Sequence, residues 1–158
     1  MAVTAALYGH FFSNALGGMT EAETPRVFDL LTDSIKVMLC TSTYVPDQDN
    51  HKFKSSVTNE LPATGGYTAG GVALASKTLV YTAAGHYLVF DAADAIWTTA
   101  TLSAVRIAVI YNARAAADAD KELIGFVDFG SDRSSVGVNF ELQWDPLGIF
   151  KLAAASPA

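Results

Sequence analysis

The most strongly patterned part of the chain runs from Leu102 to Gly130 and reads LSAVRIAVIYNARAAADADKELIGFVDFG. Its first part, Leu102–Tyr111, alternates with period two, as a β-strand does. One face of that strand carries Val105, Ile107, Val109 and Tyr111. The last part, Leu123–Phe129, is a second bulky strand in which Gly125 indicates a bulge or a close backbone approach. The polar loop Asn112–Lys121 joins the two, so this stretch predicts a folded sheet and holds nothing that resembles catalytic equipment.

The rest of the chain fits the same architecture. It has 158 residues, of which 16% are charged, against a typical share of roughly 25%. After Gly71 short strands follow one another with turns between them: Val72–Ala75, Thr78–Thr82, Tyr87–Phe90, Val136–Gln143 and Ile149–Ala153. Asp91–Asp94 followed by Ile96 predicts a corner, at which Trp97 anchors the core. We therefore expect an all-β protein, a single-domain β-sandwich or jelly-roll-like barrel.

Two segments stand apart from these strands. Residues 1–18 are predicted to form an N-terminal arm or a short helix, and residues 19–158 the β-sandwich domain. The helical spacing is that of Leu7, Phe11, Phe12 and Leu16. An ordinary first element packed on its own core explains this spacing equally well. After the strand Ile35–Thr41, the segment Ser42–Gly71 is a long loop excursion, and loops of that length usually have a task, here a predicted contact.

Charge and cysteine content exclude several classes of function. The formal net charge of −6, without clustered Lys or Arg, argues against a nucleic-acid partner. Cys40 is the only cysteine, so we expect a small buried residue and neither a disulfide nor a cysteine-based zinc site. The N-terminus lacks the features of a secretory signal, and no run approaches ~20 apolar residues. We expect synthesis in the cytoplasm and no membrane partner.

One loop has the residue types of a cation site. Asp47, Asp49 and His51 alternate in the sequence DQDNH. A helix-loop-helix calcium loop would also need glycine at its sixth position and glutamate at its twelfth, where this chain has Lys52 and Thr58. The sequence therefore favours a solvated acidic turn, and we expect no metal here.

Catalytic motifs are likewise missing from the sequence. No Gly-x-Ser-x-Gly match occurs, and the serines of Gly130–Gly137 are predicted to lie in a turn between strands. Thr64–Gly71 is glycine-rich but lacks the Lys-Ser/Thr ending of a phosphate loop. Carboxylates are plentiful, yet the sequence alone cannot pair them for glycoside hydrolysis. We expect neither catalytic residues nor a cofactor, and we expect that the protein is not an enzyme.

A series of short motifs resembles a known family. In chain order they are Leu7-Tyr8-Gly9, Ile35–Thr41, Tyr44–Asp49 (YVPDQD), Gly66–Gly71 (GYTAGG), Trp97-Thr98, Ile107–Tyr111 and Leu123–Gly130 (LIGFVDFG). Together they resemble a family of tailed-bacteriophage virion structural proteins over nearly the whole chain. The resemblance implies a structural role and, more specifically, a capsid decoration (cement) protein.

The resemblance also implies partners and a location. A decoration protein docks on the outside of the capsid at joints between subunits of the major capsid protein, which stabilises the expanded head by bridging capsomers. It would self-associate, with a trimer as one option. We expect the N-terminal segment and the long loop to clamp adjacent capsomers. The predicted contact residues are Leu7, Tyr8, Phe11, Phe12, Tyr44, Asp47, Asp49 and Tyr67.

Two other functions stay open at this point. One is a tail or head–tail joining component, which would be present in few copies. The other is a carbohydrate-binding virion β-sandwich, whose stacking faces would come from Tyr44, Tyr67, Tyr87 and Trp97. Within the opening stretch, Arg106 and Asp128 place charges in apolar strands, so each should be exposed, paired or at an interface.

Overall fold

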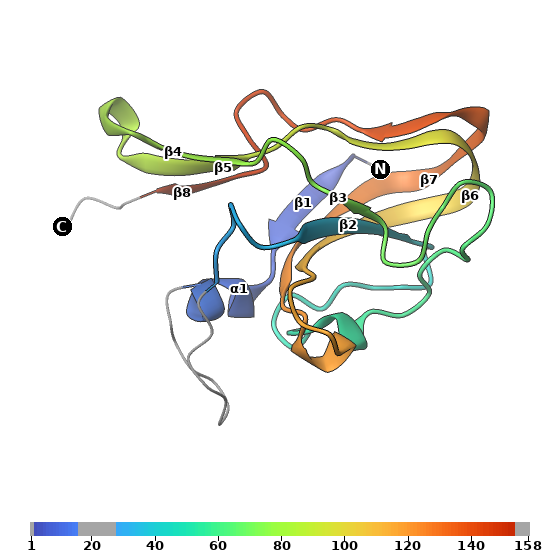
Figure 1. Ribbon diagram of the computed structural model, residues 1–158, viewed down its shortest axis with the longest axis horizontal. Coiled ribbons are helices and arrows are strands. Elements are labelled where there is room, and N and C mark those ends of the chain that lie inside the picture. Colours follow the sequence, from blue (N-terminus) through green and yellow to red (C-terminus); the bar gives the residue numbers. More distant parts are fainter. Residues whose placement is uncertain (1, 16–27, 154–158) are drawn as a thin grey trace.

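Two antiparallel sheets make up most of the computed structural model, which describes residues 2–15 and 28–153 (Figure 1). The five-stranded sheet has the order β1 (Thr4–Leu7), β7 (Leu123–Leu142), β6 (Ala95–Asn112), β2 (Ile35–Cys40) and β3 (Val72–Ala73). The three-stranded sheet has the order β4 (Thr78–Thr82), β5 (Tyr87–Asp91) and β8 (Phe150–Ala153). The described residues also form one short helix, α1 (Gly9–Ala15), and three 3₁₀ turns, η1 (Lys54–Ser56), η2 (Ala83–Gly85) and η3 (Asp118–Asp120). The predicted all-β, sandwich-like single domain is confirmed.

A long two-stranded ribbon organises the molecule. β6 has 18 residues and β7 has 20, and they pair along most of their length. Register shifts between Trp97 and Ile107 interrupt the ladder, and there the ribbon bends back on itself, at the right of Figure 1. Apolar side chains fill the space inside the bend, where the ring of Trp97 lies 5.9 Å from that of Phe140. The bend thus encloses the main core.

The predicted turn at Gly130–Gly137 is wrong, because β7 continues through it. Ser135 belongs to the ladder: its hydroxyl donates to the carbonyl of Ala100 (2.8 Å) and lies 3.3 Å from the amide nitrogen of Leu102, which donates to it. Gly130 and Gly137 are therefore part of a bent strand and do not form a loop. β6 likewise begins at Ala95, so Trp97 lies inside a strand and not at a corner, although it is buried as expected.

β2 separates two apolar clusters. Ile35, Val37 and Leu39 point into the main core, as the period-two pattern predicts, whereas Met38 and Cys40 point to the opposite face. That second face also carries Tyr8, Tyr44, Ile107, Val109, Tyr111 and Leu123. The long loop supplies Tyr44 to this cluster, so part of the excursion covers the sheet.

The N-terminal segment packs on the chain's own core. β1 pairs with β7, and the side chain of Phe11 in α1 is buried against other aromatic rings. A Cβ added at Gly125 would lie 3.0 Å from the carbonyl oxygen of Ala6, which confirms the close backbone approach predicted there. The predicted domain boundary at residue 18 and the apolar residue Leu16 lie outside the described residues.

Candidate functional site

A pocket of about 390 Å³ opens where the long loop meets the end of the five-stranded sheet. Its charged lining comes from Lys36, Lys54, Glu60 and Lys121, and its floor includes Tyr111. The rest of the wall consists of small residues: Ser34, Ala69, Gly70, Ala113 and Ala115. Because small residues occupy so much of the wall, the charged groups border open space.

Backbone pairing brings the lysines to this place. The amide of Lys54 donates to the carbonyl of Lys121 (2.8 Å), and an isolated bridge joins Phe53 to Glu122, so the two chain segments run side by side. In the β2–β6 ladder Lys36 stands directly opposite Tyr111, and directly opposed residues share a face of the sheet. Lys36, Lys54 and Lys121 therefore meet although they come from distant parts of the sequence.

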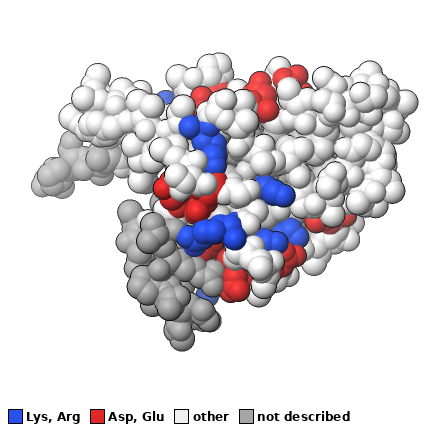
Figure 2. Space-filling model, viewed as in Figure 1, with Lys and Arg blue, Asp and Glu red and all other residues white. Residues whose placement is uncertain are grey.

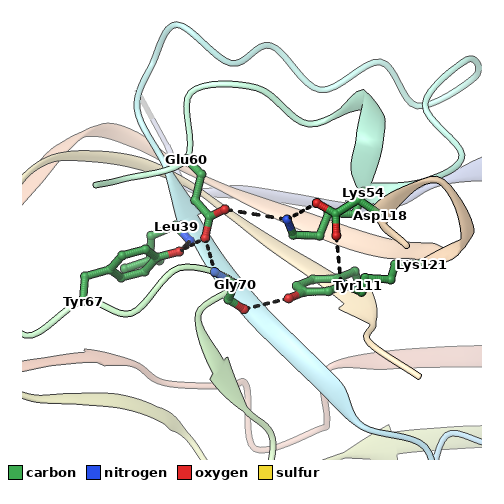
Figure 3. Close-up of polar contacts among 8 residues, drawn as sticks. All are labelled: Leu39, Lys54, Glu60, Tyr67, Gly70, Tyr111, Asp118 and Lys121. Atoms are coloured by element: carbon green, nitrogen blue, oxygen red, sulfur yellow. Dashed lines mark hydrogen bonds and ion pairs between the residues drawn. The ribbon is translucent and has the colours of Figure 1, made fainter. Parts of the chain in front are cut away.

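Glu60 is held by the loop on one side of the pocket (Figure 3). The hydroxyl of Tyr67 donates to Glu60 Oε1 at 2.7 Å, and the amide of Gly70 donates to the same oxygen at 2.5 Å. Glu60 Oε2 lies 3.8 Å from the ammonium group of Lys54. Burial, above all, raises the pKa of Tyr67, which also accepts a hydrogen bond from the amide of Leu39 (3.0 Å). Tyr67 thus stays a neutral donor that fixes the carboxylate.

Asp118 ties the two neighbouring lysines together. Lys54 and Lys121 each donate to a different oxygen of its carboxylate, both at 2.8 Å. These two hydrogen bonds, that from Lys121 first, hold the pKa of Asp118 below its usual value. Beneath them the hydroxyl of Tyr111 donates to the carbonyl of Gly70 (2.8 Å), and burial raises the pKa of this phenol. The site therefore presents fixed charges above a neutral aromatic floor.

Most of the predicted contact residues are buried or half-buried in the chain itself. Tyr8, Phe11, Tyr44 and Tyr67 are buried inside the chain, each with 3% of its surface exposed or less. Leu7 and Phe12 are half-buried and pack against the main core. Asp47 is half-buried and Asp49 is exposed. These eight side chains do not form one outward-facing surface, since most of them hold the fold together.

The acidic loop is a hydrogen-bonded turn. Asp47 Oδ1 accepts from the amides of Asp49 (3.1 Å) and Asn50 (3.0 Å), and the side-chain amide of Asn50 donates to Oδ2 (2.9 Å). The bonds from Asn50 are the main cause that lowers the pKa of Asp47. His51 Nδ1 lies 3.0 Å from the hydroxyl of Tyr44 and accepts from the amide of Asp47 (3.2 Å). Across the described ranges, no group of three or more His, Cys, Asp or Glu side chains could hold a metal ion.

Sequence reasoning missed the pocket. Lys36 left one signal, a single charge within the apolar strand IKVMLC, which is unusual for a strand buried on both faces. Lys54, Glu60 and Lys121 left none, because they lie in polar segments and match no motif. Only the pairing of distant segments brings them together.

Comparison of the chain with protein-family models, curated proteins and solved structures gives no match. In the part of the chain that the structure covers, none of the helices has the length and apolar character needed to span a membrane.

Proposed function

We propose that this chain is a structural protein of a tailed-phage virion, specifically a decoration protein that binds the outer capsid surface and stabilises the expanded head by bridging capsomers. Its partner is the major capsid protein, and self-association, with a trimer as one option, belongs to the same proposal. The ordered motifs of the sequence support the family. The observation that carries the docking role is an uncovered apolar surface on the three-stranded sheet.

The register of the small sheet defines that surface. At its base, a cross-strand row packs on the main core: Leu79, Phe90 and Phe150. Two positions further out, the next row on the same face is Tyr81, Leu88 and Leu152. Here Tyr81 is 58% exposed and Leu152 38% exposed. Figure 1 shows this end of the sheet extending away from the five-stranded sheet, and the exposed fractions of Tyr81 and Leu152 show that no described residue covers these two side chains fully.

An exposed apolar row on a projecting sheet suits burial against another protein. Burial of apolar surface yields roughly 25 cal/mol per Å², and a partner that covers the row would recover this free energy. Large parts of the face in Figure 2 carry no charged side chain, which keeps the cost of desolvation on docking low. Many weak contacts of this kind become strong when they are repeated over a symmetric shell.

The proposed capsid contacts differ from those expected from the sequence, which were the N-terminal segment and the long loop. The buried side chains of Tyr8 and Phe11 stabilise the chain itself, so the clamp on neighbouring capsomers is assigned to the outer row of the small sheet. The exposed turn around Asp49 remains available as a second contact.

The alternatives differ in what supports them. A tail or head–tail joining component would use the same apolar surface and differ in copy number. The carbohydrate-binding alternative loses most of its stacking faces, because Tyr44, Tyr67 and Trp97 are buried. The remaining ring, Tyr87, is half-buried and has the ammonium group of Lys151 4.8 Å from its centroid. An enzyme is the alternative with least support.

Co-sedimentation tests the docking role. Purified protein is mixed with expanded heads that lack it, and the bound fraction is measured for the wild type and for the double variant Tyr81→Ser/Leu152→Ser. Both side chains are exposed, so the variant should fold normally yet lose binding by about tenfold or more. The matched control is Val136→Ser, which changes a 79% exposed residue of β7 and should bind as the wild type does. Equal binding by all three proteins would reject the small sheet as the docking surface.

A further inference from the structure

We propose that the pocket between the long loop and the end of the five-stranded sheet is a binding site for a single carboxylate group. The proposal stands on the pocket and is independent of the virion role. The carboxylate could come from a free organic acid or from an acidic side chain of a protein, and the experiment below separates these two sources.

Five charged side chains line the pocket or are bonded to its lysines, and their charges do not cancel. Lys36, Lys54 and Lys121 are positive, whereas Glu60 and Asp118 are negative, so this set of five has one positive charge in excess. The neighbouring ion pairs of Arg114 with Asp33 and Glu122 are not part of this set. The whole chain has a net charge of −6, so this excess runs against the general balance. An anion with one negative charge would neutralise it.

The excess charge belongs to Lys36. Lys54 and Lys121 are both bonded to Asp118, whereas Lys36 makes no ion pair with any residue in the ranges 2–15 and 28–153. It is half-buried on β2 with its ladder partner Tyr111 beside it. A half-buried ammonium group without a carboxylate partner gains more from an incoming anion than a fully solvated one does.

The walls leave room for a compact ligand. The small residues Ser34, Ala69 and Ala113 border the pocket, whose volume is about 390 Å³. The side chains of Lys54 and Lys121 are only 14% and 19% exposed, so their charges are partly shielded from water and act more strongly over short distances. Figure 3 shows Lys54 between the two carboxylates, with its position fixed before any ligand arrives.

The occupied hydrogen-bond capacity of Glu60 argues against a cation as the ligand. Its Oε1 already accepts from Tyr67 and Gly70, and its Oε2 faces Lys54. A carboxylate is favoured over inorganic phosphate because the excess is one charge, while phosphate carries between one and two negative charges at neutral pH. The structure thus favours a monocarboxylate.

An NMR titration with two monocarboxylates tests the site. The backbone amide of Gly70 reports on the pocket, and that of Gly125, next to β1, serves as the internal reference. The probes are acetate, which represents a free acid, and an end-blocked Gly-Glu-Gly tripeptide, which represents a protein side chain. We expect saturable shifts of Gly70 in the millimolar range. If the tripeptide binds more tightly than acetate, the natural carboxylate is an acidic side chain of a protein. If acetate binds equally well, it is a free organic acid.

Variants decide whether Lys36 carries the site. Lys36→Gln should weaken binding about tenfold, and Lys36→Arg should retain most of it because the charge remains. Lys151→Gln removes a positive charge from the small sheet and should leave the affinity unchanged. Native-like spectra away from the pocket establish that each variant is folded. The proposal is overturned if neither carboxylate shifts Gly70, if Lys36→Gln binds as the wild type does, or if inorganic phosphate binds more tightly than both probes.

Discussion

Two glycines with left-handed backbone angles show how much depends on single residues. Gly71 has φ +70° and Gly137 has φ +62°, a region that disfavours any side chain. A Cβ at Gly71 would overlap the carbonyl oxygen of Val37, whereas one at Gly137 would meet no atom within 4 Å. We predict that Gly71→Ala lowers the free energy of unfolding by more than about 2 kcal/mol, and that Gly137→Ala costs about 1 kcal/mol. Urea denaturation measures both, and equal losses would show that the contact with Val37 does not matter.

The ion pair of Arg106 and Asp128 gives a pH-dependent contribution to stability. Arg106 Nε donates to Asp128 Oδ1 at 2.5 Å, so the two charges are paired, one of the three outcomes expected from the sequence. This bond is the main cause that lowers the pKa of Asp128 in the folded state. The stabilisation is therefore present above the unfolded pKa, about 3.9, and is lost as the pH falls through the lower folded value.

Asp128→Asn tests this linkage. At neutral pH the variant should be less stable than the wild type by up to about 1 kcal/mol, since the pair is partly exposed. Below about pH 4 the difference in free energy of unfolding should shrink towards zero. A difference that stays constant across this range, measured by chemical denaturation, would show that the ion pair contributes nothing to stability.

At the scale of elements, the long loop acts as a cover for the second face of the sheet. Tyr44 lies in that cover, its hydroxyl 2.8 Å from that of Tyr8, and the thiol of Cys40 lies buried in the same cluster. Burial raises the pKa of Cys40 to about 12, so the thiol should react with labelling reagents only after the cover opens. Because this is the only cysteine, its labelling rate reports on the loop alone.

Tyr44→Ala should open the cover. Removal of a large buried ring costs about 3–5 kcal/mol, and we predict faster labelling of Cys40 under native conditions. His51→Gln, which removes the ring stacked on Tyr44 from outside, is the milder comparison and should accelerate labelling less. If Cys40 in the Tyr44→Ala variant reacted as slowly as in the wild type, the loop would not be what protects it.

Elements with a local signal could be predicted from the sequence, and the others could not. The strands β4 and β5 follow the predicted ranges Thr78–Thr82 and Tyr87–Phe90 closely, because the short Ala-Ala-Gly segment between them is a local turn signal. The full length of β7 could not be predicted, because serine and glycine normally mark turns and here serve a bend within a ladder. In the N-terminal segment the helical spacing matches the short helix α1. It gives no sign of β1, because the partner strand β7 is more than a hundred residues away.

At the scale of the whole molecule, the two candidate surfaces follow from the way the sheets are arranged. The bent ribbon of β6 and β7 encloses the main core, and the small sheet reaches beyond it with its apolar outer row. The pocket lined by Lys36, Lys54 and Lys121 forms where the long loop meets the end of the five-stranded sheet. The pocket could not be found from the sequence, since only tertiary pairing places Lys36 beside Tyr111 and Lys54 beside Lys121.

A cryo-electron microscopy map of the virion that contains this chain is the sharpest test of the proposed docking on the capsid. The account predicts density for the two sheets on the outside of the capsid, in many equivalent copies at the joints between capsomers, with the outer row of the small sheet against the shell. Density confined to the tail or to the head–tail joint would contradict it.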